Sequence, residues 1–476
     1  MNAAAASDFN PALLDIEVNS FATDSREVKA GDLFFAFSQP EFKANGFNGE
    51  FQDATRFVPT AFANGAAACV IRRDRFKEHN SELDTFEDRL IFSNDVIVSF
   101  QTLARNVYRE WGKPVVAVTG SAGKTTAKEL TAHVLEAAGL RVLRNTKNLN
   151  NGLGHPMTVL NLVNDPGYDA AVLEMGMSTP NREIARLCTI TPPDVAIELN
   201  VLPVHIEHLG TIEKIRDAKA ELVEGLKDGG TAVLNADDPF VIGMKDRHKG
   251  KVLTYGIDNP ADVTALGIEA RGYGETRFTL QTPEGFEEVD LSLSGKHNIL
   301  NALAAAAAGH IFGMTASRIA EALSAVGPPP QRGEVIRFTE GFTVLNDSYN
   351  SNPDALLKMI ATLVEGAPKG ARKIVVAGEM LELGNEEESI HTETGKRIAA
   401  SGIDKLVGVR GLATALVDGA IEAGLEDAEF SADSEAAGRL VSSLVREGDV
   451  ILVKGSRGVR TERVIERLLA DHVKAD

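Results

Sequence analysis

Short apolar runs alternate with longer stretches of helix-forming residues through the middle of the chain. The apolar runs lie at residues 115–119, 170–175, 194–199 and 230–238. Strands that alternate with helices are typical of a parallel sheet that is covered on both faces. The pattern therefore predicts an α/β domain in the centre of the chain.

The pattern differs on either side of this central block. Residues 21–73 predict short strands and turns, and residues 94–111 predict a helix that leads into the central block. Around residues 252–293 the spacing favours short alternating β segments, before a helix that starts near His297.

Three consecutive prolines at residues 328–330 are the strongest linker signal, because proline fits neither the interior of a helix nor a central strand. A second alternating set follows, with apolar runs at 343–347, 373–379, 405–409 and 449–456. This set predicts a separate, small, doubly wound domain. We therefore predict three domains, with the limits 1–94, 95–327 and 328–476.

A glycine-bounded loop, TGSAGKTT at 119–126, joins the strand predicted at 115–119 to a helix. Its two glycines permit a close approach of a ligand to the backbone, and the N–H groups that start the helix form an anion site. Lys124 supplies a positive charge for phosphate oxygens, and Thr125 supplies a hydroxyl for Mg²⁺. The loop is predicted to bind a nucleoside triphosphate.

One residue departs from the usual phosphate-loop pattern G-x-x-x-x-G-K-S/T. The first glycine of that pattern is replaced by Val118. A helix-capping turn without a ligand therefore stays open as an alternative, although the strand before the loop and the helix after it favour the phosphate loop.

Composition adds limits to this picture. A chain of 476 residues with 43% hydrophobic and 25% charged residues is long enough for about two to four soluble domains. The formal charge of −19 disfavours nucleic acid or an anionic membrane as the main partner. The only cysteines, Cys69 and Cys188, are far apart, so neither a disulfide framework nor a cysteine zinc site is indicated.

The chain also lacks the usual signals for export and membrane insertion. Its first ten residues have no basic region followed by an apolar core, and the longest apolar run, at 302–308, is far shorter than a membrane span. We expect a cytoplasmic protein.

Two side chains beyond predicted strands are candidate metal ligands. Glu174 ends such a strand, where ligands of open α/β sheets bind, and it could hold Mg²⁺ together with Thr125. A solvated acid at a strand end is the alternative. His205 follows another strand, but Mg²⁺ prefers oxygen ligands, so the spacing alone does not assign it a metal role.

Lys219 lies on the apolar stripe of a helix predicted at 211–226, together with Ile212, Ile215, Leu222 and Leu226. A lysine there must lose its charge, find a partner or extend to solvent. A neutral buried amine can also react with CO₂ to form a carbamate, which is an anionic metal ligand. The residues alone favour extension to solvent.

Polar side chains recur at other loops and helix starts. The glycine-rich loop at 146–156 displays Lys147, Asn148, Asn150 and Asn151. Such amides suit polar ligand recognition, although a turn without a ligand is the alternative. Asn298 and Asn301 share one helix face and could reach a base edge, or they could cap the helix.

Three polar loops follow strands of the last block, at 346–356, 378–384 and 452–458. We expect them to meet at one edge of a sheet and to form a site that faces the central domain. Arg332, just after the prolines, could reach an anion there.

Taken in order, these motifs resemble those of the Mur ligases. They are TGSAGKTT, TKNLNNGLGHP, EMG, VHIEHLG, AKAEL, NADD, GKHNILNALAAA, NDSYNSNP, GEMLELG and KGSR, and they extend over about residues 20 to 465. The family's loop TGxxGKT accounts for Val118. KNLNN and YNSNP favour the branch that adds D-alanyl-D-alanine.

The resemblance implies a three-domain Mur ligase architecture. It implies a first domain that binds a UDP-muramoyl peptide, a central P-loop ATPase sheet, and a Rossmann-like third domain that binds the incoming dipeptide. The implied activity is an ATP-dependent amide ligase that joins D-alanyl-D-alanine to UDP-N-acetylmuramoyl-tripeptide through an acyl phosphate, in a monomer. Folate or diamino-acid ligases, and an ATP-controlled binding protein without turnover, are the rivals.

The resemblance also assigns residues. ATP would contact Thr119, Gly120, Ser121, Ala122, Gly123, Lys124, Thr125, Thr126, Asn298, Asn301, Arg332 and Asp347. Thr125 and Glu174 would hold one Mg²⁺, and His205 and a carbamylated Lys219 would hold a second. Lys124, Glu174, His205 and Lys219 would act in catalysis. The two other substrates would contact Asp24, Ser25, Arg26, Asn148, Asn150, Asn151, Tyr349, Asn350, Asn352, Lys454 and Arg457.

One segment departs from the family pattern. After LFFAF the family continues with a glycine and a DGH-like segment, whereas this chain reads SQPEFKANGFNG at 38–49. The residues of the first domain that hold the uridine therefore stay open.

Overall fold

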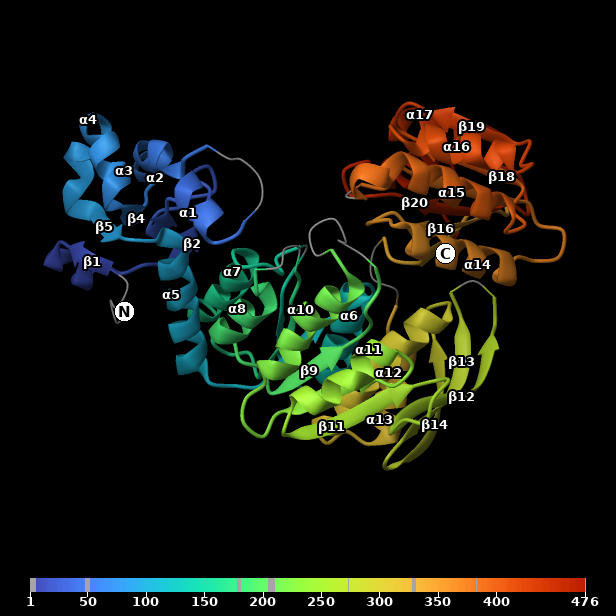
Figure 1. Cartoon of the computed structure of the whole chain (residues 1–476), viewed down its shortest axis with the longest axis horizontal. Coiled ribbons are helices and arrows are strands. Elements are labelled where there is room, and N and C mark those ends of the chain that lie inside the picture. The colour runs from blue at the N-terminus through green and yellow to red at the C-terminus, as the bar shows by residue number, and fades with distance from the viewer. Residues whose placement is uncertain are drawn as a thin grey trace.

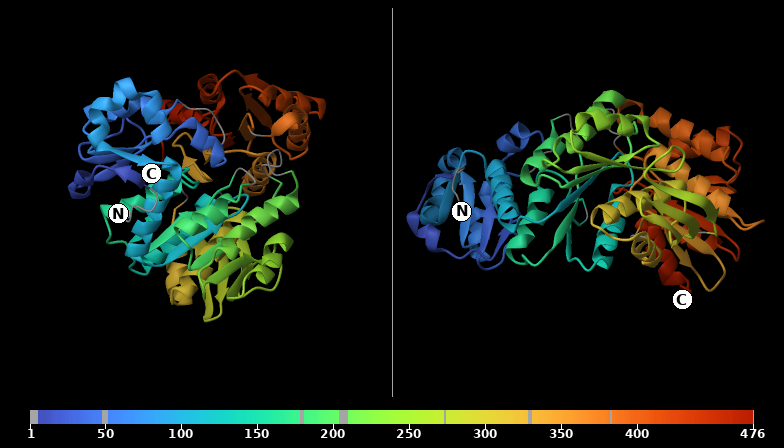
Figure 2. Two further views of the ribbon diagram at one scale, coloured as in Figure 1. Left: turned by 60° about the vertical axis from the view of Figure 1, so that its left-hand side comes forward. Right: turned by 90° about the horizontal axis from the view of Figure 1, so that it is seen from below.

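The computed structural model describes residues 6–47, 52–146, 148–177, 181–203, 210–272, 274–327, 331–381 and 383–475. These residues form three β-sheets, one after another along the chain, each with its own helices (Figure 1). The first and third sheets lie on opposite sides of the central one, and the views from the front and from below both separate them (Figures 1 and 2). The predicted α/β class is confirmed, whereas the exact domain limits stay a prediction.

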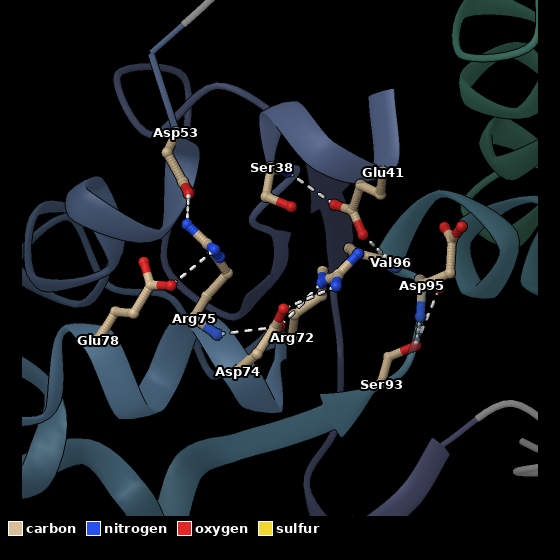
Figure 3. Close-up of polar contacts among 10 residues, drawn as sticks. All are labelled: Ser38, Glu41, Asp53, Arg72, Asp74, Arg75, Glu78, Ser93, Asp95 and Val96. Carbon is tan, nitrogen blue, oxygen red and sulfur yellow. Dashed lines mark hydrogen bonds and ion pairs between the residues drawn. The ribbon is translucent and has the colours of Figure 1, made fainter. Parts of the chain in front are cut away.

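The first sheet has the order β1-β5-β4-β3-β2, and its last four strands are parallel. Its strands are β1 (Ala6–Phe9), β2 (Ser20–Ala22), β3 (Asp32–Phe35), β4 (Ala68–Arg72) and β5 (Leu90–Ser93). Its helices are α1 (Gln39–Ala44), α2 (Val58–Ala63), α3 (Arg73–Glu78) and α4 (Asn80–Leu83). Charged and polar side chains gather where β3, β4 and β5 end (Figure 3).

Helix α5 (Val96–Trp111) joins the first sheet to the central one. Asp95 caps its start by accepting the Val98 N–H, and Gly112 ends it with a left-handed φ of 64°. The Phe100 ring packs on Phe35 of β3, with ring centroids 4.8 Å apart, while the other side of the helix contacts the central unit. The helix therefore lies in one apolar core that the first and central units share.

The central sheet has nine strands in the order β14-β13-β12-β11-β10-β9-β6-β8-β7. Its parallel part comprises β6 (Val115–Thr119), β7 (Val142–Arg144), β8 (Ala170–Glu174), β9 (Val195–Glu198), β10 (Thr231–Asn235), β11 (Lys251–Gly256) and β12 (Val263–Ala270). The antiparallel strands β13 (Thr276–Thr282) and β14 (Gly285–Leu291) complete it. All four predicted central strands are confirmed.

Helices cover both faces of this sheet, because alternate residues of its strands are apolar on both sides. Val116 and Val118 of β6 face one core, whereas Val115 and Ala117 face the other. The helices are α6 (Lys124–Ala137), α7 (Gly154–Leu160), α8 (Glu183–Ile190), α10 (Ile212–Glu224), α11 (Pro239–Ile242), α12 (Lys296–Ile311) and α13 (Ala316–Ala325). The alanine-rich run at 302–308 is fully buried in α12, which packs against α6.

The third sheet has the order β15-β16-β20-β17-β18-β19, with only β15 antiparallel. Its strands are β15 (Glu334–Arg337), β16 (Thr343–Asp347), β17 (Lys373–Gly378), β18 (Lys405–Val409), β19 (Ala428–Ser431) and β20 (Val450–Lys454). Its helices are α14 (Pro353–Gly366), α15 (Glu387–Ala399), α16 (Ala413–Glu422), α17 (Ser434–Leu444) and α18 (Glu462–Asp471). The last strand, β20, inserts between β16 and β17, so the strand order reverses there.

The three prolines at 328–330 lie outside the described residues. Among the helices of the ranges given above, none combines the length and the apolar character needed to cross a lipid bilayer.

Candidate active site

A cavity of about 490 Å³ lies between the central and third sheets. The central unit lines it with the glycine-bounded loop, the end of β8 and the start of α12. The third unit lines it with the segments that follow β16 and β20. Strand ends of two parallel sheets therefore face one another across a single space, as expected for ligand sites of α/β sheets.

The glycine-bounded loop has the predicted form, with β6 ending at Thr119 and α6 starting at Lys124. Gly123 has a φ of 84°, a left-handed conformation that favours glycine. A Cβ at Gly123 would also lie 2.7 Å from Oδ1 of Asn301 in α12. The close approach of α12 to the loop therefore requires this glycine.

Asn200, just beyond β9, holds the loop from the side. Its Oδ1 accepts the Ala122 N–H at 2.9 Å, and its Nδ2 donates to the Ala122 carbonyl at 3.0 Å. The Ser121 N–H also donates to the Asn200 carbonyl, at 2.9 Å. One asparagine thus pairs with both backbone groups of a loop residue.

Lys124 turns back onto its own loop, where its Nζ donates to the Gly120 carbonyl at 2.9 Å. Burial lowers the pKa of its amine, the nearby Glu174 carboxylate raises it, and Arg332 lowers it further. Glu174 and Arg332 line the same cavity as Lys124, so charged groups from the central and third units meet there.

Glu174 lies at the end of β8, and the strand neighbouring it, β6, leads into the loop. Its Oε2 accepts the Thr125 hydroxyl at 2.7 Å, and its Oε1 accepts Nδ2 of Asn150 at 2.7 Å. The side chain is only 4% exposed. Glu174 and Thr125 are therefore brought together, as their positions at neighbouring strand ends predicted, and Asn150 joins them, which was not predicted.

Lys219 of α10 stays inside the protein, so the expected extension to solvent is wrong. It is 3% exposed, and Ile215 and Leu222 on the same stripe are buried. Glu198, which ends β9, is fully buried, and among the described residues neither of its carboxylate oxygens has a hydrogen-bond partner.

Burial favours the uncharged forms of both Lys219 and Glu198. Burial lowers the pKa of Lys219 well below its ordinary value, Lys124 lowers it further, and Glu198 raises it. Burial likewise raises the pKa of Glu198, while Lys219 lowers it. The Lys219 amine is therefore a buried nitrogen with reduced proton affinity.

The third sheet contributes a polar wall. Nζ of Lys454 donates to Asp347 at 2.5 Å and to the Asn350 carbonyl at 2.8 Å, which ties the ends of β20 and β16 together. The Tyr349 ring is stacked by Arg332, with the guanidinium carbon 4.0 Å from the ring centroid, and Arg457 lies 5.6 Å from the same centroid. These residues were predicted to share one edge, and all of them line the cavity.

Two family descriptions match most of the chain. The Mur ligase middle domain matches residues 118–309, and the Mur ligase glutamate ligase domain matches residues 331–457. The chain is also 35% identical over 458 residues to the UDP-N-acetylmuramoyl-tripeptide–D-alanyl-D-alanine ligase of Escherichia coli (strain K12), covering 95% of this chain and 94% of that protein. This chain belongs to the Mur ligase family.

Solved structures resemble this Mur ligase over its whole length. A crystal structure of MurF from Acinetobacter baumannii has a TM-score of 0.83 at 27% identity and covers 95% of this chain and 94% of its own. MurF ligase from Thermotoga maritima in complex with ADP has a TM-score of 0.81 at 29% identity and covers 96% and 98%. The predicted family and architecture are confirmed.

Some predicted site residues of this Mur ligase lie away from the cavity. The Asp24 carboxylate, after β2 in the first sheet, pairs with the exposed Arg26 guanidinium at 2.5 Å. Its hydrogen bonds to the Arg26 side chain and N–H lower the pKa of Asp24 to about 2. The neighbouring Ser25 is buried. Their contact with a UDP-muramoyl peptide stays a prediction.

Two residues of the glycine-rich loop at 146–156 (the amide loop) differ in role. Asn148 lines the cavity, whereas Oδ1 of Asn151 accepts the N–H groups of Leu153 and Gly154, so it shapes the turn before α7. Lys147 and His205 lie outside the described residues, and their predicted roles stay predictions.

Sequence reasoning missed several residues that line the cavity. They are Asn200, Asn235, Tyr255, His297, Ser351 and Lys358. Three of them, Asn235, His297 and Ser351, stand inside the recognised motifs NADD, GKHNILNALAAA and NDSYNSNP. Their position after a strand or at a helix start was the available signal.

Proposed function

We propose that this Mur ligase uses ATP to join D-alanyl-D-alanine to UDP-N-acetylmuramoyl-tripeptide, in the synthesis of peptidoglycan precursors. The observation that carries the proposal is the single cavity in which the glycine-bounded loop and Glu174 face the polar strand ends of the third sheet. A reaction that combines a triphosphate with two further substrates needs such a space between domains. The Escherichia coli relative carries the same activity in its name.

The triphosphate fits the glycine-bounded loop. Backbone N–H groups at the start of α6 face the cavity, and Lys124, Arg332, Lys358, Lys454 and Arg457 line it. This local excess of cations is notable in a chain with a formal charge of −19, and it suits a polyanionic ligand. The Thermotoga maritima relative was solved with ADP.

The residues around Glu174 fit a Mg²⁺ ion. Oxygen atoms of Thr125 and Glu174 lie 2.7 Å apart beside the phosphate loop, and Mg²⁺ prefers oxygen ligands. When bound, the ion neutralises charge on the phosphate oxygens. The chain holds both ligands ready, because the Asn150 amide fixes the other Glu174 oxygen.

A carbamate on Lys219 would supply a ligand for a second ion. The buried amine, with its lowered pKa, can attack CO₂ and release one proton to form the anion. Within the ranges that the structure describes, no three side chains of His, Cys, Asp or Glu come together as a metal site. A second site would therefore depend on this carbamate and on His205.

The chain's own residues position the reaction. The tripeptide carboxylate attacks the γ-phosphorus of ATP as the bond to ADP breaks, which gives an acyl phosphate and ADP. The amine of D-alanyl-D-alanine then attacks the acyl carbon, loses a proton and displaces phosphate. No side chain forms a covalent bond, so the protein acts by orienting the reactants and by offsetting charge, chiefly with Lys124.

The dipeptide is expected at the wall formed by Tyr349, Asn350, Asn352, Lys454 and Arg457, and the UDP end at the first sheet. Closure of the third unit onto the central one would bring the amine to the acyl phosphate and exclude water. The proposal also includes that the protein is a monomer and acts in the cytoplasm.

The test is ADP and phosphate release by the purified protein with ATP and Mg²⁺. We expect release only when both UDP-N-acetylmuramoyl-tripeptide and D-alanyl-D-alanine are present, with the amide product detected by mass spectrometry. Release with glutamate or a diamino acid in place of the dipeptide would contradict the proposal. ATP binding without release in any mixture would indicate a binding protein instead.

A further inference from the structure

Asn145 occupies the junction between β7 and the amide loop, and its side chain is 2% exposed. Its Oδ1 accepts the Glu174 N–H at 2.9 Å, while its Nδ2 donates to the Glu174 carbonyl at 2.9 Å and to the Leu149 carbonyl at 3.0 Å. The paired strands β7 and β8 end their register at Arg144 and Val172. Beyond that point, the Asn145 side chain takes the place of β7 and hydrogen-bonds to the backbone of Glu174, the candidate metal ligand.

Lys128 holds Asn145 from the opposite side. It is 1% exposed in α6, and its Nζ donates to the Asn145 carbonyl at 2.5 Å and pairs with Glu129 at 2.8 Å. A buried ammonium is tolerated only with such partners, so its position is fixed. Lys128 lies three residues after Thr125 in the same helix, which ties that helix to Asn145.

The amide loop is attached to the same point. Its Leu149 carbonyl accepts from Asn145, its Asn150 amide donates to Glu174, and the Asn150 carbonyl accepts the Gly176 N–H at 2.9 Å. Three contacts therefore meet around Glu174: Asn145 binds its backbone, the Asn150 amide binds its carboxylate, and Lys128 of α6 holds Asn145. Neither Asn145 nor Lys128 lines the cavity.

We propose that Asn145, fixed by Lys128, is a positioning residue that sets the Glu174 carboxylate against the Thr125 hydroxyl for binding Mg²⁺. The inference rests on the Mg²⁺ site proposed above and deepens it. On its β6 side, Glu174 is still paired with Val118. On its β7 side the strand pairing has already ended, and there the Asn145 side chain engages both backbone groups of Glu174 and so fixes the base of the carboxylate side chain. Partners that orient a metal ligand typically alter metal affinity about 10- to 100-fold when they are removed.

The decisive variant is Asn145→Asp, which keeps the size of the side chain. Its second oxygen would face the carbonyls of Glu174 and Leu149, where the amide nitrogen now donates. We expect the Mg²⁺ concentration for half-maximal ADP formation to rise about 10-fold or more, while the KM for D-alanyl-D-alanine stays within about twofold. Lys128→Met should shift the Mg²⁺ dependence in the same direction.

A direct binding measurement makes the test independent of turnover. Mn²⁺ is titrated into each protein with ADP present, and the free ion is followed by electron paramagnetic resonance. Asn145→Asp and Lys128→Met should weaken Mn²⁺ binding about 10-fold or more, and Glu174→Gln should weaken it at least as much.

Two matched variants control for the loss of buried polar contacts. Thr276→Val removes a buried hydroxyl that donates to the Leu293 carbonyl at 2.9 Å, at the outer part of the central sheet. Lys405→Met removes a 9% exposed lysine that pairs with Asp427 at 2.7 Å, at the start of β18. Both should leave the Mg²⁺ dependence and Mn²⁺ binding as in the wild type.

Each outcome decides one claim. If wild-type ADP formation and Mn²⁺ binding are independent of Glu174, the proposed Mg²⁺ site itself fails. If the wild type depends on Glu174 but folded Asn145→Asp and Lys128→Met keep wild-type Mn²⁺ binding, the role of Asn145 is refuted. Should Asn145→Asp not fold, Asn145→Ser takes its place, because it removes the two donated bonds with a smaller change in charge.

Discussion

Glu41 should give the first sheet a stability that depends on pH near neutrality. Its carboxylate is fully buried and accepts the Ser38 N–H at 2.7 Å and the Val96 N–H at 2.9 Å, at the starts of α1 and α5 (Figure 3). Arg72 attracts this charge, whereas Asp95 repels it. One buried acid thus joins a helix of the first sheet to the helix that leads into the central unit.

The magnitude follows from the burial of this acid. Burial is the main cause that raises the pKa of Glu41 from its ordinary value of 4.5 to about 7, and the nearby Asp95 also raises it. The two backbone hydrogen bonds and Arg72 lower the pKa, but they do not offset the effect of burial. The folded protein therefore binds the proton more tightly than the unfolded chain. This favours folding below pH 4.5, and the contribution, about 3 kcal/mol, is lost as the pH rises through about 7.

The assay uses urea unfolding followed by the fluorescence of Trp111, the only tryptophan of the chain, which ends α5. Unfolding free energies are measured from pH 5 to 9 for the wild type and for Glu41→Gln, which cannot titrate at this position. We expect the stability of the wild type relative to the variant to fall by about 3 kcal/mol over this range.

A control variant separates this effect from general charge changes. Glu78→Gln removes an acid of α3 whose side chain is 55% exposed and pairs with Arg75 at 2.8 Å (Figure 3). It should leave the pH dependence of the wild type unchanged. Parallel pH dependences for the wild type and Glu41→Gln would refute the reasoning.

Three further predictions concern the cavity. Lys124→Met should lower ADP formation about 100-fold or more, because it removes the charge that faces the phosphates, and near-normal turnover would contradict this role. Lys219→Ala should be inactive, and a short carboxylic acid should partly restore its activity. The wild-type protein in ¹³C-bicarbonate should give a carbamate carbon signal in nuclear magnetic resonance. If there is neither a signal nor a rescue, the carbamate is excluded. Gly123→Ala should abolish ATP binding in calorimetry, because its Cβ would lie 2.7 Å from Oδ1 of Asn301, whereas Gly243→Ala meets nothing within 4 Å and should bind normally.

The strands and the phosphate loop were predictable because their signals are local. The run 115–119, the two glycines and the helix formers after Lys124 lie within a few residues of one another. The meeting of Glu174 with Thr125 was also predictable, because both follow parallel strands and such strands end at one edge of a sheet.

The polar contacts that fix these groups were not predictable from local patterns. Asn145 binds the backbone of Glu174, 29 residues later, and Asn200 binds that of Ala122, 78 residues earlier. An asparagine in a loop carries no mark of such a distant partner. The residues alone favoured extension of Lys219 to solvent for the same reason, because they do not show that the carboxylate of Glu198, at the end of β9, influences this helix residue. The carbamylated lysine was implied only by the resemblance to the Mur ligases.

The insertion of β20 between β16 and β17 has a consequence for synthesis on the ribosome. The middle of the third sheet is filled by residues 450–454, close to the end of the chain. A nascent chain can complete its first two folded units while this gap is still empty, because domains fold in order as they emerge. Lys454 and Arg457 are made after the other residues of the polar wall, so a polypeptide terminated before them would retain its nucleotide loop yet have no complete partner for it.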